Sequence, residues 1–248
     1  MPRLVSFRLA AACALALILV FSLSAVAVAK GPVADLRVVG AGGKVLSETS
    51  FGVAGQVSIK TSSQATCFGA GTGGSGKSVK VKGATALGML LRAAQFTAAL
   101  KPVSISDHFD FGLALCGIGG TQATKSASWY LKVNHENPEL GGEVVEVGAG
   151  DDVLWALAGF PYPKELWLSA PNNVQAEQPF GVRVFAYDDK GKRKPAAGVT
   201  VSGASGPTDA SGRATVTLGK PAKLIARHGK DLPSNREVVC VGGKCPPK

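Results

Sequence analysis

Polar and apolar residues alternate along most of the chain, as they do in strands that bury one face. Residues 126–157 are the clearest case, because they alternate on both sides of a polar turn at 134–142 and then enter an apolar stretch after a Gly-Asp pair. The side chains that share a face are Trp129, Leu131 and Val133 before the turn and Val145 and Val147 after it. This pattern predicts a hairpin followed by a closing strand.

One segment has the periodicity of a helix instead. Apolar side chains recur three or four positions apart within residues 85–96, at Leu87, Leu90, Leu91 and Ala94. Thr85 has the short hydroxyl side chain favoured at a helix N-cap, whereas Gly88 is a weak helix former. We therefore expect one amphipathic helix packed on a sheet. The chain also contains 32 glycines and 14 prolines, so the predicted fold class is mainly β.

The character of the chain changes after residue 158. Residues 159–164 carry two prolines and are predicted to link two domains. Residues 165–248 contain short alternating strands between Gly and Asp turns, a pattern typical of a β-sandwich. The predicted inward side chains are Phe180, Val182, Val184 and Ala186 in one strand and Ala214, Val216 and Leu218 in another. The run GVTVSG followed by TDASGRATVTL resembles bacterial Ig-like surface domains, which implies an Ig-like sandwich.

Three short motifs in the first half occur in an order that resembles a known family. They are a helix beginning TALGMLLRAA, a strand WYLKVN and a strand GDDVLW. Over residues 33–158 the chain is similar to the transcobalamin-C-terminal-like family of secreted and surface proteins. The resemblance implies a β-grasp-like α+β domain at residues 30–158. The chain departs from the family in its glycine-rich insertion at 69–76 and in a cysteine pair that the family does not require.

The same resemblance implies where a small ligand or partner would bind. The residues in the matching motifs that could contact it are Trp129, Tyr130, Asn134 and Trp155. The alternative is that both tryptophans belong to the hydrophobic core, as large aromatic side chains commonly do.

The N-terminus predicts export. Arg3 and Arg8 precede an apolar run over residues 9–29, which ends in the small residues Ala27 and Ala29. This is the organisation of a secretory signal peptide at residues 1–29, cleaved after Ala29. An uncleaved anchor is the alternative, since about twenty apolar residues can span a bilayer. In both cases we expect an extracellular or cell-envelope location.

The chain has a net charge of +10, which favours anionic partners. Cleavage after Ala29 removes two arginines and no acids, which leaves +8. Such a chain is attracted to anionic surfaces. The densest basic clusters are Lys77, Lys80 and Lys82, and the run Lys190–Lys194. They indicate either solvated surface charge or a site for an anionic cell-envelope component; nucleic acid is not an expected partner.

Four cysteines remain after cleavage, at Cys67, Cys116, Cys240 and Cys245. An even number in an exported chain predicts two disulfides, for which three pairings are possible. Proximity in the sequence favours Cys67 with Cys116 and Cys240 with Cys245. A zinc site is disfavoured because no Cys-x-x-Cys pair occurs.

The stretch GTGGSGKS, residues 71–78, fits the phosphate-binding P-loop pattern. A working P-loop follows a buried strand and opens a helix. Here the upstream residues are polar, and Val79 and Val81 alternate with lysines in the pattern of a strand. We therefore expect no ATP binding, and the DFG triplet at 110–112 lacks the other motifs of a kinase.

No catalytic, metal-binding or cofactor-binding residue is predicted. The HENPE segment around His135 contains Pro138 and reads as a solvated turn, whereas metal-binding HExxH motifs need a helix. We expect a non-catalytic binding or adhesion protein, which binds a small ligand or an envelope component through its first domain. The alternatives are an extracellular metal-dependent hydrolase that uses His135, Glu136 and Asp151, and a purely structural envelope protein.

Overall fold

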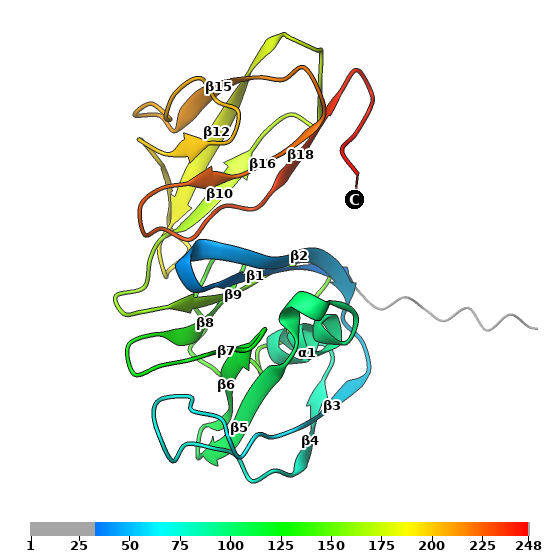
Figure 1. Cartoon of the computed structure of the whole chain (residues 1–248), viewed down its shortest axis with the longest axis vertical. Helices are drawn as coiled ribbons and strands as arrows, with labels where there is room; N and C mark the ends of the chain where they lie inside the picture. The colour runs from blue at the N-terminus through cyan, green and yellow to red at the C-terminus, as the bar shows by residue number, and fades with distance from the viewer. Residues whose placement is uncertain (1–32, 248) are drawn as a thin grey trace, which may run out of the picture.

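The structure, a computed structural model, describes residues 33–247. The predicted signal segment and its cleavage site at Ala29 lie outside these residues. Within them the protein is mainly β with one α-helix, as the sequence predicts, and its elements form two halves that each have a hydrophobic core (Figure 1).

A four-stranded sheet organises the first half. Its strand order is β2-β1-β9-β8, in which β1 and β9 are parallel and the other pairs antiparallel. The strands are β1 (Val33–Gly40), β2 (Lys44–Gly52), β8 (Ser128–Val133) and β9 (Asp152–Ala158), with the short 3-10 helix η1 (Ala41–Gly43) between β1 and β2. The first and last strands of this half are therefore neighbours at the centre of the sheet.

The helix and two small sheets cover one face of that sheet. Helix α1 is followed by the 3-10 helix η2, and the small sheets have the orders β3-β4 and β5-β6-β7. The bounds are α1 (Ala86–Phe96), η2 (Ala98–Leu100), β3 (Gln56–Lys60), β4 (Ser78–Lys82), β5 (Val103–Phe109), β6 (Gly112–Ile118) and β7 (Thr121–Gln122). Figure 1 shows α1 between the four-stranded sheet and these hairpins. The core of this half is formed between these layers.

The predicted helix and its N-cap are confirmed. The Thr85 hydroxyl accepts a hydrogen bond from the Gly88 amide at 3.2 Å, and the apolar stripe of the helix is buried. Gly88 has a packing role that explains its place in a helix. A Cβ at this position would lie 1.9 Å from the Lys82 carbonyl oxygen, so only glycine allows the helix to approach the end of β4 this closely.

The predicted hairpin strand through Val145 and Val147 is wrong. Strand β8 pairs directly with β9, and residues 134–151 form an irregular connection between them. Residues of this connection form hydrogen bonds with backbone groups near the helix start, and Val145 and Val147 lie in no strand. The Ala86 amide donates to the Val145 carbonyl at 2.9 Å, and the Val147 amide donates to the Ala84 carbonyl at 3.0 Å. Helix starts have free backbone groups that need such partners, which local alternation does not reveal.

The glycine-rich loop at 69–76 leads into a strand. Strand β4 begins at Ser78 and pairs with β3, so the position where a P-loop starts a helix is occupied by extended chain. The loop is held by polar contacts, since the Ser75 amide and hydroxyl both donate to the Asp107 carboxylate at 2.6 Å. In the DFG triplet, Asp110 and Phe111 form the turn between β5 and β6, and Gly112 begins β6.

Both predicted disulfide pairings are confirmed. Cys67 is bonded to Cys116 across 49 positions, and Cys240 to Cys245 across 5. The first pair is fully buried and joins the glycine-rich loop to strand β6. The second closes a small ring at the end of the last strand.

The second half consists of short strands around one core. One sheet joins β10 to β12, which pairs on its other side with β13 and β15; a second sheet has the order β11-β18-β16, and β14 pairs with β17. The strands are β10 (Glu165–Ser169), β11 (Asn173–Val174), β12 (Pro179–Tyr187), β13 (Arg193–Pro195), β14 (Thr200–Val201), β15 (Arg213–Thr217), β16 (Ala222–Leu224), β17 (Ala226–Arg227) and β18 (Glu237–Val241). The side chains predicted to point inward do so, with Val182, Val184 and Val216 buried at the centre.

The two halves share an apolar contact. Val39, Leu154 and Ala156 lie on the face of the four-stranded sheet opposite α1, and they pack with Leu232 of the second half. Residues 159–164 connect β9 to β10 beside this contact. The central strands are therefore buried on both faces, which explains their nearly continuous apolar sequence.

Candidate functional site

The four residues suggested as ligand contacts do not share an open surface. Trp129 and Trp155 are 6% and 4% exposed and belong to the core of the first half, where the Trp155 indole donates to the Ala86 carbonyl at 3.3 Å. Tyr130 is buried on the other face of β8, stacked on Tyr162 of the connecting segment. Asn134 lies in the turn after β8. Both tryptophans thus belong to the hydrophobic core, which was the alternative stated from the sequence.

A cluster of buried charges lies where the halves meet. Glu165, at the start of β10, is fully buried and forms an ion pair with Arg37 of β1. Its carboxylate also lies 3.7 Å from the ammonium of Lys132 and 3.1 Å from Nδ1 of His135. Arg37 further donates to the Pro233 carbonyl at 2.8 Å. Three side chains from the first half therefore converge on one carboxylate from the second.

The electrostatics of the cluster follow from this convergence. Burial alone would raise the pKa of Glu165, but contact with His135 and the charges of Arg37 and Lys132 outweigh it and keep the pKa below its usual range. Burial lowers the pKa of Lys132, and Glu165 opposes that effect. Because buried ions are stabilised only by their partners, removing one charge here leaves others uncompensated.

The prediction that His135 is a solvated turn residue is wrong. Its side chain is 17% exposed, its ring stacks on Tyr187 at 3.8 Å, and it packs edge-on against Trp167 at 4.8 Å. The turn itself is present, with positive φ angles at Asn134 and His135. The second half covers this turn, and the local sequence contains no signal of that contact.

Asp152 lies beside this cluster in a crevice of about 310 Å³. Burial, reinforced by the nearby carboxylates of Glu165 and Asp35, raises its pKa to about 6, although Arg37 and His135 act in the opposite direction. It is therefore a carboxyl group that the folded protein ionises with difficulty.

Replacing Asp152 by asparagine is expected to stabilise the protein at neutral pH but not near pH 4. Between its ordinary pKa of 3.8 and the folded value of about 6, the folded state holds a proton that the unfolded chain has released, so stability falls as pH rises through this window. The difference between the two pKa values corresponds to roughly 3 kcal/mol, which is an upper limit for the gain. Urea denaturation of both proteins at about pH 4 and pH 7.5 measures it. If the free energies of unfolding of the two proteins differed by the same amount at both pH values, the raised pKa of Asp152 would be contradicted.

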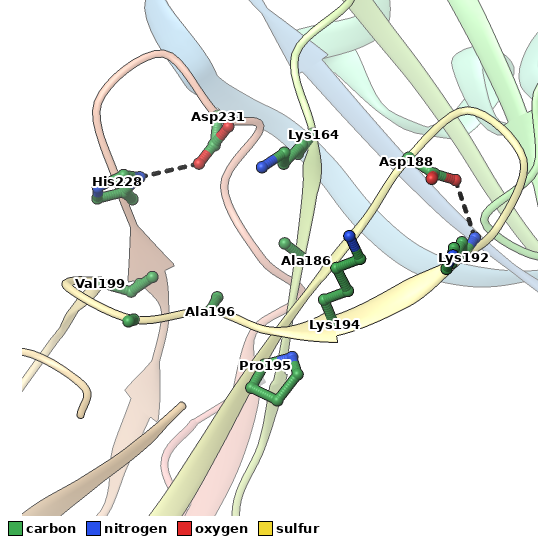
Figure 2. A pocket seen from close by; sticks show the side chains of 11 residues that line it. Lys164, Ala186, Asp188, Lys192, Lys194, Pro195, Ala196, Val199, His228 and Asp231 are labelled. Atoms are coloured by element: carbon green, nitrogen blue, oxygen red, sulfur yellow. Dashed lines mark hydrogen bonds and ion pairs between the residues drawn. The ribbon is translucent and has the colours of Figure 1, made fainter. Parts of the chain in front are cut away.

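A basic pocket lies in the second half, beside the end of the connecting segment. Its volume is about 220 Å³, and Figure 2 shows the Lys164 and Lys194 side chains extending into the space between the Asp231 and Asp188 carboxylates. Lys192 completes the basic lining. Lys164 comes from the segment before β10, Lys192 and Lys194 from β13 and the turn before it, and Asp231 from the loop after β17.

The acids of this pocket are already engaged. Asp188 accepts hydrogen bonds from the Lys190 and Lys192 amides at 2.9 Å each, and these backbone bonds, that from Lys192 foremost, lower its pKa. Asp231 is paired with His228 at 2.9 Å. None of the ammonium groups of Lys164, Lys192 and Lys194 forms an ion pair within residues 33–247. The three lysines therefore exceed the two carboxylates of the pocket by one positive charge, and none of them is held in a salt bridge within the described residues.

A larger cleft adjoins the pocket and shares His228 and Asp231 with it. Its volume is about 980 Å³, and it lies between the two halves. Its apolar lining comes from the connecting segment and the end of β9, and its rim is basic. The apolar residues are Leu157, Ala158, Phe160, Pro161 and Pro163, and the rim residues are Arg227 and Lys230. Phe160 is 87% exposed. A cleft of this size between domains, with apolar walls and a few charges, is a common form of ligand site.

The residues of the suggested hydrolase site are not brought together. His135 faces Glu165, whereas the Asp151 carboxylate accepts from Asn134 and the Gly148 amide at 2.8 and 2.7 Å. Within residues 33–247 no group of three histidine, cysteine or acidic side chains is placed to hold a metal ion. No helix in the same range is long and apolar enough to cross a bilayer.

Comparisons with protein-family models, with curated proteins and with solved structures found no match. The basic pocket and the adjoining cleft form the candidate site. The sequence contained one signal for it, the basic run Lys190–Lys194, which the structure divides between the two faces of the β12–β13 pair.

Proposed function

We propose that the protein is an exported, non-catalytic binding protein that holds an anionic component of the cell envelope in the basic pocket and the adjoining cleft. The observation that carries the proposal is the group of lysines at Lys164, Lys192 and Lys194, which have no carboxylate partner in the described chain although two acids line the same pocket. An excess of positive charge at a concave surface attracts and orients an anion.

The proposed architecture is a β-grasp-like first domain followed by an Ig-like sandwich. The parallel pairing of β1 with β9 at the centre of the order β2-β1-β9-β8, with α1 across one face, supports the first part. Two sheets that share one core support the second. The disulfides support export, because such bonds persist in oxidising compartments. The proposal differs from the sequence expectation in the place of the site, which we put in the second half and in the cleft between the halves and not within the first domain.

Charge-removing substitutions in the pocket should separate specific from general attraction. We expect the double variant Lys164→Gln/Lys194→Gln to weaken binding to polyglycerol phosphate, an envelope-type phosphodiester polymer, by about tenfold or more, because it removes two charge-assisted contacts. The matched control is Lys220→Gln/Lys223→Gln, which removes the same charge from exposed positions of the same half. Titration of the polymer by calorimetry or fluorescence measures both. Equal weakening of the two variants would show that net charge alone drives binding and would refute the pocket.

A further inference from the structure

The outer face of the sheet formed by β10, β12, β13 and β15 carries a second group of cations. Alternation along the strands places Arg183 and Phe185 of β12 on this face, together with Arg193 of β13 and Arg213 of β15. Arg183 lies directly opposite Arg213 on one side and Ser169 on the other. All three arginines are exposed. Lys192 and Lys194 flank Arg193 and line the basic pocket on the other side, so the two sites have no residue in common.

This arrangement works against the stability of the sheet. Like charges directly opposite each other in an antiparallel pair are destabilising. Within residues 33–247 none of the three arginines has an ion pair. The acid next to Arg213 is Asp209, whose carboxylate accepts from the Ser211 hydroxyl and from the amides of Ser211 and Arg213 at 2.7 to 3.0 Å. None of the three guanidinium groups is therefore held in a salt bridge within the described residues, although the Asp209 carboxylate lies near enough to Arg213 for their charges to interact.

Phe185 holds two of the guanidinium groups in place. The Arg183 and Arg193 guanidinium carbons lie 4.7 and 4.5 Å from the centre of its ring. Such cation–π contacts orient long side chains that would otherwise be mobile. The same contacts occupy the ring, which leaves it poorly available for stacking with a nucleobase, the usual basis of single-strand binding.

A hollow of about 420 Å³ lies beside Arg183 and Arg213. Its other lining residues include Ser169, Pro171 and Gly181. Gly181 borders open space: a Cβ there would meet no atom within 4 Å, and its φ is outside the left-handed region. The position thus has room for a larger side chain that would extend into the hollow.

We infer that this hollow binds the carboxylate groups of an acidic polysaccharide. The planar guanidinium fork matches a carboxylate with two parallel hydrogen bonds. The exposed Ser169, Thr215 and Thr217 lie along the same face and offer hydroxyl groups to the sugar rings. The exposed residues of this face allow an extended chain to lie along them, while the hollow holds one acidic group.

The test places a negatively charged side chain in the hollow, where it competes with the ligand. In Gly181→Glu the new carboxylate occupies the space between the arginines, and we expect binding of polygalacturonate to fall by about tenfold or more. The matched control is Gly206→Glu, an exposed glycine with equally open surroundings. It adds the same charge and should change binding by less than about twofold. Gly181→Ala, which leaves most of the hollow open, should also retain binding. Thermal melts of each variant verify that it is folded.

Three outcomes would overturn the inference. The first is an equal loss of polygalacturonate binding in Gly181→Glu and Gly206→Glu, and the second is retained polygalacturonate binding in Gly181→Glu. The third is binding of a single-stranded oligonucleotide that depends on Gly181 and is tighter than the binding of polygalacturonate. The variant Lys164→Gln/Lys194→Gln should retain polygalacturonate binding. The experiments therefore distinguish a wrong proposal for the basic pocket from a wrong proposal for this face.

Discussion

Replacing Glu165 by glutamine is expected to lower the free energy of unfolding by about 3–5 kcal/mol, the usual effect of breaking a buried ion pair by removing one partner. The side chain is 1% exposed, and its loss leaves Arg37 and Lys132, which are themselves buried, without their shared counter-charge. Because the pKa of Glu165 is held below its ordinary value of 4.5, its stabilising effect is complete above that pH and is lost as pH falls through the folded value.

Urea denaturation at about pH 7.5 measures the effect. The control is Asp231→Asn, which breaks the exposed His228 pair and should change stability by no more than about 1 kcal/mol. A loss of similar size in both variants would mean that the buried cluster does not hold the two halves together. The double variant Glu165→Gln/Arg37→Gln should lose less than the sum of its single changes, because the two residues act as one unit.

Removing the Cys67–Cys116 disulfide is expected to cost about 4 kcal/mol, since the bond closes a loop of 49 positions and restricts the unfolded chain. We propose Cys67→Ala/Cys116→Ala, because alanine leaves no unpaired polar group at these fully buried positions. The effect is a large fraction of the stability of an ordinary domain, and calorimetric melts will record it.

The second disulfide supplies the comparison. Cys240→Ala/Cys245→Ala opens a ring of only 5 positions and should cost about 2 kcal/mol. If the C-terminal pair proved the more important, loop length would not govern the contribution of these bonds, and local packing around Cys240 would have to be considered instead.

Sequence reasoning succeeded where the determining interactions are local. The helix at Ala86–Phe96 was predicted because its apolar spacing and its Thr85 cap lie within a few residues of one another. It failed at Val145 and Val147, whose alternation reflects contacts with the helix start and not a strand. It also failed at His135, which is covered by residues more than thirty positions later, at Trp167 and Tyr187. Periodicity identifies a buried side but not what buries it.

The amino-acid sequence by itself determined the mainly β class, the single helix, the inward faces of the C-terminal strands and the favoured cysteine pairing. Each of these depends on periodicity, capping or short chain separation, which act along the chain. Only the tertiary structure decided the central pairing of β1 with β9, the contact of Arg37 with Glu165 across 128 positions, and the division of the basic run between a pocket and an open face. These features arise because folding brings distant segments of the chain together. Whether a charged side chain is paired or unpaired then depends on residues that no local sequence pattern specifies.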